Sequence, residues 1–364
     1  MTTGAAPVPP TAEAGSLPGV TRSARPTAWL GGLGVGVVVL LAFMPSIVSQ
    51  ADTSILLNFF ILLTMSSMWN LLAGYAGMVS IGQQAFVGLG AYTVLVLADG
   101  GFSPVAAIPI AALVCAALSV PISLLVFRLR GGYFAIATWV VADAASLVIS
   151  SIGSLGGGTG KPVPGMSGLS PKSFEQVTYW AALAVVVVAV GMTYALLRSR
   201  LGLVLAAVRD NEVGARSAGA RVVTARRIVY LVAALGCGAA GALLAVSQLN
   251  VQPASVFNVQ WSAEMIFVTM IGGIGTIEGP ILGSVVFFLL QQNLAHEGAW
   301  YLIIFGALAV VIAIWAPRGL WGTATAKLRV QLFPVGYHVG RTRRRGRPGS
   351  APPAPPAPPV ASTA

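Results

Sequence analysis

The chain has 364 residues, of which 56% are apolar and only 9% are charged, and its mean hydropathy is +0.84. Soluble domains carry about 25% charged residues, so this composition excludes an ordinary soluble protein and indicates an integral membrane protein. The net charge of +11 comes mostly from arginines in short segments between apolar blocks, which argues against nucleic-acid binding and is typical of membrane orientation signals.

The two ends of the chain differ in composition from the rest. Residues 1–26 are rich in Pro, Ala, Thr and Gly, and we expect a disordered cytoplasmic arm rather than a signal peptide. Residues 323–364 are basic and then Pro/Ala-rich, which predicts a disordered cytoplasmic tail. The arginines of this tail either act only as an orientation signal or also contact anionic lipid headgroups.

Between the ends, residues 27–322 predict an all-α, polytopic membrane domain of about ten transmembrane segments, with 8 to 11 as the range. The long blocks without Asp, Glu, Lys or Arg, such as 53–98 and 228–263, are each long enough for about two spans of roughly 20 residues. The expected segments are 28–48, 53–73, 78–98, 103–127, 133–153, 178–197, 228–249, 258–275, 280–296 and 298–316.

The basic residues test this segment count. If the N-terminus is cytoplasmic, strict alternation places 19 of the 21 basic residues inside and only Lys161 and Lys172 outside. Such a bias satisfies the positive-inside rule. The external loop 154–177, rich in Gly, Pro and Ser, should be irregular.

Each candidate motif for catalysis or metal binding lacks residues that its chemistry requires. The "GGGTGK" run ending at Lys161 lacks the first glycine and the Ser or Thr of a phosphate-binding loop, and "GIGTIEG" from Gly273 fails the dinucleotide pattern at Glu278. Cys115 and Cys237 have no metal-ligand spacing and are expected to be small buried hydrophobes. The sequence therefore indicates neither an enzyme nor a metal site.

A first glycine-rich segment, residues 70–92, interrupts an uncharged block. Glycine costs about 1 kcal/mol against alanine in a helix interior, and backbone groups freed in lipid need other partners, so helix breaks are expected at Gly74, Gly77 and Gly82. Two interpretations remain open: the polar side chains face a translocation path, or they bond across closely packed helices. The path candidates are Asn70, Ser80, Gln83 and Gln84.

A second glycine-rich segment, residues 268–287, has the same order of an apolar helix, a glycine cluster and another apolar helix. In the expected topology, both glycine clusters lie at the cytoplasmic ends of their spans. This similarity leads to the hypothesis of a parallel internal repeat. The expected helix breaks here are Gly272, Gly273, Gly275 and Gly279.

Acidic residues in or beside apolar spans add to the path candidates, because intramembrane acids are costly and often functional. Asp143 lies in the middle of the segment 133–153 and is more informative than Glu264, which lies near a span edge. Glu278 lies close to the expected cytoplasmic boundary and is either simply hydrated or part of the path.

The long basic loop 198–227 contains a short helical pattern. Asn211 is suited to cap a helix, Glu212 and Arg216 have i,i+4 spacing, and Gly219 suits a C-terminal stop. A short helix between two spans is either a docking element for a soluble partner or a solvated connector.

These segments, in this order, resemble the permease subunits of branched-chain amino-acid ABC importers, in the LivM-like branch. The pattern N-L-L-x-G-x-x-G-x-x-S-x-G-x-x-A-F-x-G-x-G-A-Y matches residues 70–92, and R-G-x-Y-F-A-I-x-T matches residues 130–138. The runs "GGIGTIEGPILG" and "PRGLWG" also match. The cytoplasmic loop is similar to the family's coupling segment, except at Leu203 and Gly214, where arginine and alanine are usual. The resemblance covers about residues 50–322.

The resemblance implies a permease subunit that imports branched-chain amino acids and has no ATPase site, cofactor or enzymatic activity of its own. Implied partners are a second permease of the family, two cytoplasmic ABC ATPases that use ATP, and an extracytoplasmic substrate-binding protein. The implied location is the bacterial inner membrane, with both termini cytoplasmic. The implied ATPase-coupling residues are Arg209, Asp210, Asn211, Glu212, Arg216 and Gly219.

Three alternatives stay open at this point. One is the same family with another substrate, such as urea, a short amide or a different amino acid. Another is an ion-coupled secondary transporter with Asp143 as its proton site. The last is a membrane scaffold without transport.

Overall fold

The computed structural model describes residues 20–21, 27–164, 170–294, 300–316, 318–328 and 338–339. The chain divides into two units, one made of the terminal arms Met1–Pro26 and Gly336–Ala364 and the other of Thr27–Val335. In the first unit, β1 (Val20–Thr21) pairs antiparallel with β4 (His338–Val339). Most of the two segments expected to be disordered lies outside the described residues.

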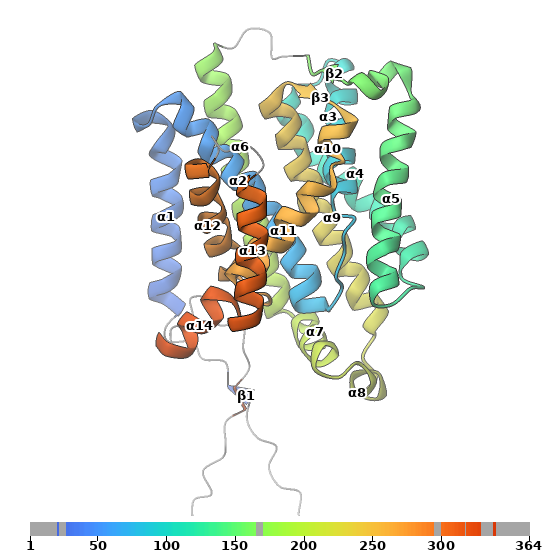
Figure 1. Cartoon of the computed structure of the whole chain (residues 1–364), viewed down its shortest axis with the longest axis vertical. Helices are drawn as coiled ribbons and strands as arrows, with labels where there is room; N and C mark the ends of the chain where they lie inside the picture. The colour runs from blue at the N-terminus through green and yellow to red at the C-terminus, as the bar shows by residue number, and fades with distance from the viewer. Residues whose placement is uncertain are drawn as a thin grey trace, which may run out of the picture. The chain divides into compact units, whose positions relative to one another are not determined.

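The second unit is built of packed helices, which confirms the prediction of an all-α, polytopic membrane protein (Figure 1). Each of the ten expected segments corresponds to one helix. These helices are α1 (Thr27–Ile47), α2 (Gln50–Asn70), α3 (Gln84–Asp99), α4 (Pro104–Val126), α5 (Gly132–Ser151), α6 (Pro171–Arg198), α9 (Val222–Gln248), α11 (Val259–Gly272), α12 (Glu278–Leu294) and α13 (Trp300–Trp315).

In the part of the chain that the structure describes, six segments are long and apolar enough to cross a membrane. They include α4, α5, α6 and α9, the stretch Asp52–Tyr75 and the stretch Ile303–Thr325. Helices α3 and α11 are shorter than their expected spans, because α3 begins only at Gln84 and α11 ends at Gly272. The count of ten crossings therefore stays a prediction.

The C-terminal boundary of the helical unit differs from the expected one. Helix α14 (Gly319–Leu328) continues past residue 322, so the predicted start of the tail at residue 323 is too early. Its sequence, GLWGTATAKL, is rich in small residues and holds no proline, so nothing in it stops a helix before Leu328.

Helix α9 forms the centre of the core and packs against α2, α3, α4 and α6. Its middle is a run of glycine and alanine, which lets neighbouring backbones approach it closely. A Cβ atom added at Gly241 would lie 1.9 Å from the carbonyl oxygen of Val87, and one at Gly90 would lie 2.1 Å from that of Gly238. The small residues of α3 and α9 are therefore required by this packing.

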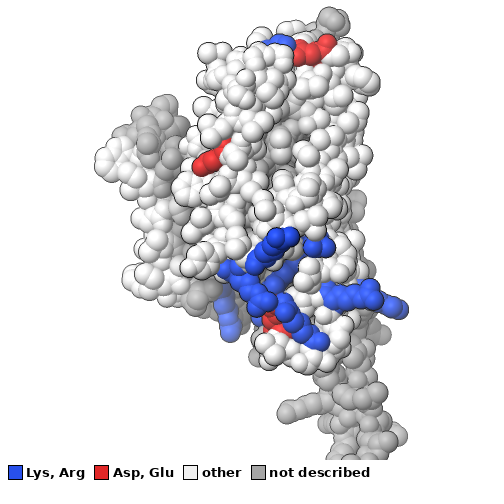
Figure 2. All heavy atoms as spheres, turned by 90° about the vertical axis from the view of Figure 1, so that its right-hand side faces the viewer, with Lys and Arg blue, Asp and Glu red and all other residues white. Residues whose placement is uncertain are grey.

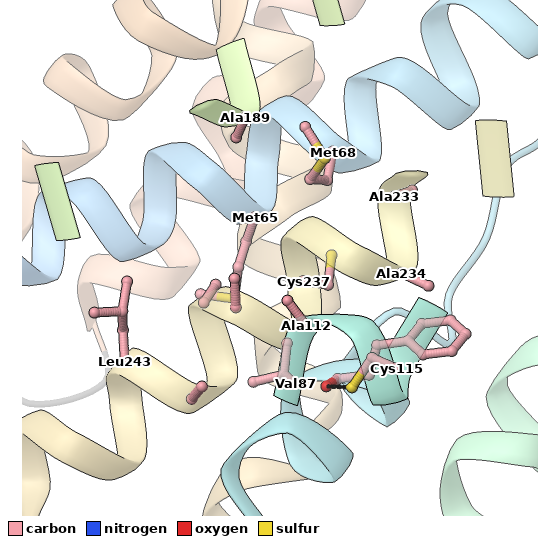
Figure 3. Packing of buried hydrophobic residues seen from close by; sticks show 14 of the residues in the cluster. Met65, Met68, Val87, Ala112, Cys115, Ala189, Ala233, Ala234, Cys237 and Leu243 are labelled. Carbon is pink, nitrogen blue, oxygen red and sulfur yellow. Dashed lines mark hydrogen bonds between the residues drawn. The ribbon is translucent and has the colours of Figure 1, made fainter. Parts of the chain in front are cut away.

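Sulfur-containing and small apolar side chains fill the space around α9 (Figure 3). Cys115 and Cys237 are both fully buried and free, which confirms that they act as small hydrophobes. The Cys115 thiol also donates a hydrogen bond of 3.4 Å to the carbonyl oxygen of Phe86.

The expected external loop has more order than its composition predicts. Two 3₁₀ turns, Gly153–Leu155 and Gly157–Thr159, are followed by β2 (Lys161–Pro162), which pairs with β3 (Asn250–Val251). Lys161 also forms a 2.8 Å ion pair with Asp99. Positive φ angles at Gly156, Gly157 and Gly160 make these tight turns feasible. Helix α6 then begins at Pro171, capped by Ser170, instead of at residue 178.

The two glycine-rich segments are packed differently. Helix α11 packs directly on α12, whereas α2 and α3 both pack on α9. The internal repeat therefore stays a hypothesis.

Candidate functional site

The two glycine-rich segments meet at one end of the helical unit. At the C-terminal end of α2, the helix widens into the π-helical turn Leu71–Tyr75 (η1), and the loop 273–277 between α11 and α12 lies against it. Asn70, 1% exposed, joins the two. Its Nδ2 donates a 2.7 Å hydrogen bond to the carbonyl oxygen of Thr276, and its Oδ1 accepts one of 2.8 Å from the backbone N–H of Gly275. We call this pair of bonds the Asn70 clamp.

Glycines make the approach of these two segments sterically feasible. A Cβ atom at Gly74 would lie 2.5 Å from the backbone nitrogen of Gly275, and Gly275 itself has a φ of +78°. In the second segment, a Cβ atom at Gly272 would lie 1.8 Å from the carbonyl oxygen of Gly279. Of the seven expected helix breaks, Gly77 and Gly273 also have positive φ angles. Gly82 instead lies tight against the backbone of Thr138.

The basic loop 198–227 contains two short helices, α7 (Arg200–Asp210) and α8 (Glu212–Ser217). Helix α8 begins where the sequence predicted, because the Asn211 side chain accepts a 2.9 Å hydrogen bond from the backbone N–H of Gly214. Gly219 has a φ of +83° beyond its end. Helix α7 is an addition that the sequence analysis missed. The side chain of Asp210 lies outside the described residues.

Glu212 links α8 to the start of α9. Its carboxylate forms ion pairs of 2.6 Å with Arg216 and 2.9 Å with Arg226. Partial burial raises the pKa of this carboxyl, but the hydrogen bond and charge of Arg226, followed by the charges of Arg216 and Arg130, outweigh burial and lower the pKa overall. Glu212 is therefore ionised at neutral pH. The sequence analysis found Arg216 but missed Arg226, which lies 14 residues away along the chain.

Two arginines connect α7 and the start of α9 to the first glycine-rich segment, residues 70–92. Arg209 donates a 3.4 Å hydrogen bond to the carbonyl oxygen of Gly74, and Arg226 donates one of 3.4 Å to that of Ala76. Figure 2 shows that Lys and Arg gather at this end of the face on which α7 and α8 lie, whereas most of the height of that face is uncharged. The contacts form a continuous chain from α8 through Arg226 to the first glycine segment, and from Arg209 through Gly74 to the Asn70 clamp.

The predicted path residues Ser80, Gln83 and Gln84 are fully buried among protein groups. The Ser80 hydroxyl oxygen accepts hydrogen bonds from the backbone N–H of Gly82 and from Gln83 Nε2, and Gln84 Oε1 accepts one from the Ser262 hydroxyl. Only the Ser262–Gln84 contact joins two helices, so it favours bonding across helices for Gln84, whereas Ser80 and Gln83 bond within their own segment. Contact of the three path residues with a substrate stays a prediction.

The two acidic path candidates have opposite environments. Glu278 is only 6% exposed at the N-terminus of α12, so the alternative of a simply hydrated side chain is wrong. Asp143 is exposed in the middle of α5, a helix that is largely uncovered at the edge of the bundle (Figure 1). The structure brings Asn70, Gly74 and Arg209 together, and it does not bring Asp143 to them.

Glu264 proved more informative than its position near a span edge indicated. Its side chain is 5% exposed and borders a cavity of about 430 Å³ between α2, α9, α11 and α12. Among the described residues, no group of His, Cys, Asp and Glu is arranged to hold a metal ion.

Known proteins resemble this chain over most of its helical unit. The family model described as "Branched-chain amino acid transport system / permease component" matches residues 53–313. The high-affinity branched-chain amino acid transport system permease proteins LivM of Salmonella typhimurium and Escherichia coli are each 26% identical over 324 residues. Each alignment covers 82% of this chain and 76% of the relative. No solved structure matches the chain.

Proposed function

The chain belongs to the family of permease components of branched-chain amino acid transport systems, and from this premise we propose that it imports leucine, isoleucine and valine as a subunit of an ABC importer. Membership makes it a multi-pass transport subunit. The curated relatives are permeases for branched-chain amino acids, and this supports the same substrate class here over urea, short amides or other amino acids.

The proposed assembly has four kinds of component. A second permease of the same family completes the path, two cytoplasmic ABC ATPases use ATP, and an extracytoplasmic binding protein delivers the substrate. This chain binds no cofactor and has no catalytic activity in the proposal. The bias of 19 basic residues to one side supports an orientation with both termini cytoplasmic in a bacterial inner membrane.

The observation that carries the proposal is the set of contacts from α8 through Arg226, and from α7 through Arg209, to the first glycine-rich segment. Helix α8 is held to the bundle through Glu212 and Arg226, and Arg226 bonds to Ala76 beside the first glycine segment. An ATPase that moves α8 would thereby move the backbone around η1, a π-helical turn of the kind that often marks functional sites. Coupling of this kind requires contacts that differ between two states of the transporter.

The exposed face of α5 supports the place of the second permease. Tyr133, Ile136, Val140, Asp143 and Leu147 recur at spacings of three and four residues, and all five side chains are exposed. This spacing is typical of a helix–helix seam. A charged side chain in the middle of a membrane is costly unless it faces protein or a water-filled path. We place the translocation path along this seam, with Asp143 as a path residue.

The coupling contact is tested in proteoliposomes that contain the whole transporter. Arg226→Gln removes the ion pair with Glu212 and the bond to Ala76, whereas Arg227→Gln changes an exposed neighbour on the same helix turn. We expect ATP-driven leucine uptake to fall about tenfold in Arg226→Gln, the equivalent of about 1.4 kcal/mol of coupling, while basal ATP hydrolysis persists. Arg227→Gln should behave as the wild type. Equal uptake in both variants would contradict the coupling role.

The alternative of an ion-coupled secondary transporter rests on the exposure of Asp143 in α5. It is tested with the permease chain alone in liposomes under an imposed proton gradient. Proton-driven leucine uptake without ATPases, abolished by Asp143→Asn, would favour that alternative over the importer.

A further inference from the structure

Polar side chains gather around the cavity between α2, α9, α11 and α12. The cavity has a volume of about 430 Å³, within the range of about 300–1,000 Å³ that small-molecule sites occupy. Its polar lining residues are Asn58, Gln260, Glu264, Gln291 and Gln292. Of these five residues, Glu264 is buried, whereas Asn58 and Gln292 are exposed at the edge of the cavity.

The cavity lies away from the coupling contacts. Its residues come from the N-terminal parts of α2 and α11 and the C-terminal parts of α9 and α12. The Asn70 clamp, by contrast, joins the C-terminal end of α2 to the loop after α11. The cavity is also separate from the α5 seam, because no residue of α5 is among the described lining residues.

Glu264 gives the cavity its chemical character. The side chain is 5% exposed, and its Oε1 accepts a 2.8 Å hydrogen bond from Gln260 Nε2. No lysine or arginine is among the described residues that line the space. A buried carboxylate without a cationic neighbour is costly, so a cationic group that enters the cavity gains a strong partner.

The remaining wall is apolar. Leu244, Phe287 and Leu62 face the same space as Glu264, and Phe287 and Leu62 are almost fully buried. A ligand therefore meets a carboxylate and amides on one side and aliphatic and aromatic surface on the other.

We propose that this cavity binds a small molecule that carries a protonated amine next to a branched or aromatic apolar group. The ammonium donates hydrogen bonds to the Glu264 carboxylate and to amide oxygens, and the apolar part packs on Leu244 and Phe287. A branched-chain amino acid is one member of this class, and only its use as a probe rests on the proposed function. The site is distinct from the path along α5.

Binding is measured on the whole transporter in lipid nanodiscs without nucleotide. The probe is radiolabelled 3-methylbutylamine at neutral pH, with L-leucine, 3-methylbutanol and 4-methylpentanoate as competitors. We expect the amine to bind and leucine to compete, whereas the alcohol and the carboxylate, which lack an ammonium, compete at least tenfold more weakly. Absence of amine binding, or equal competition by 4-methylpentanoate, would overturn the proposal.

Variants assign the binding to this cavity. Glu264→Gln should weaken amine binding at least tenfold and Glu264→Asp less. The control Glu175→Gln changes an acid that bonds to Ser54, and neither residue is among the described residues that line the cavity, so it should leave binding unchanged. If Glu264→Gln fails to assemble, Gln292→Glu adds a second carboxylate at an exposed edge of the cavity and should tighten binding. Unchanged affinity in Gln292→Glu, or in a correctly assembled Glu264→Gln, would refute the assignment. If the wild-type transporter binds the amine at this cavity but shows no ATP-driven leucine uptake, the result counts against the proposed function and not against the site.

Discussion

Replacement of Asn70 by leucine tests how the two glycine-rich segments are held together. The amide bonds two backbone groups of the loop 273–277, at 2.7 Å to Thr276 and 2.8 Å to Gly275. Leucine has nearly the same shape and makes neither bond. A buried polar group left without a partner costs about 1–3 kcal/mol, and both groups here are partly buried. We therefore expect Asn70→Leu to lower the free energy of unfolding by about 2–4 kcal/mol.

The assay is an equilibrium unfolding titration with a denaturing detergent in mixed micelles, read by fluorescence and by size-exclusion profile. Asn293→Leu is the matched control, because Asn293 is exposed and bonds only within its own helix, to the carbonyl oxygen of Leu289. It should change the unfolding free energy by less than about 0.5 kcal/mol. If Asn70→Leu is no more destabilising than Asn293→Leu, the clamp does not hold the segments together.

Three further predictions address the packing, the coupling loop and the seam. Gly272→Ala should destabilise the protein by about 1–3 kcal/mol, because its Cβ would overlap the backbone of α12, whereas Gly191→Ala, with open space around it, should stabilise it by up to about 1 kcal/mol. Because the pKa of Glu212 is lowered, its ion pairs hold α8 at pH values above the ordinary carboxylate range and release it as the pH falls through the lowered pKa. Hydrogen-exchange protection of residues 211–221 should therefore fall with the pH in the wild type. In Glu212→Gln this protection should be low at every pH. Asp143→Leu should reduce coupled leucine uptake at least tenfold while the assembled complex persists on size-exclusion chromatography.

Each of these has a result that contradicts it. Equal unfolding free energies for the two glycine variants would remove the steric argument. Protection of residues 211–221 that is the same in Glu212→Gln and in the wild type at every pH would show that the ion pairs do not hold α8. Normal uptake by Asp143→Leu, together with higher stability, would indicate that α5 faces lipid instead of a path.

The positions of the helices follow from local chemistry. A span needs about 20 apolar residues and must satisfy its own backbone hydrogen bonds in lipid, so blocks and breaks in the sequence map onto helices and interruptions. The start of α8 was equally predictable, because an Asn cap and an i,i+4 ion pair involve residues within one turn. Helix α7 was missed because its charged and apolar residues resemble a solvated connector.

The environments of the polar side chains were not predictable in the same way. Gln84 and Asp143 both interrupt apolar helices, yet one is fully buried against Ser262 and the other is exposed. A membrane helix that is apolar all round has no polar face to show which side meets the protein core. The sequence pattern therefore could not rank Asp143, Glu264 and the glutamines by exposure.

The sequence by itself determined the class of protein, the order of its helices, the places where glycine interrupts them and the resemblance to a permease family. Only the tertiary structure decided which interruptions meet. Asn70 and Thr276 are 206 positions apart, and no periodicity links residues at such a distance. Their contact exists because small residues let α2, α11 and α12 approach until one amide spans the gap, and the same packing left Glu264 beside a cavity.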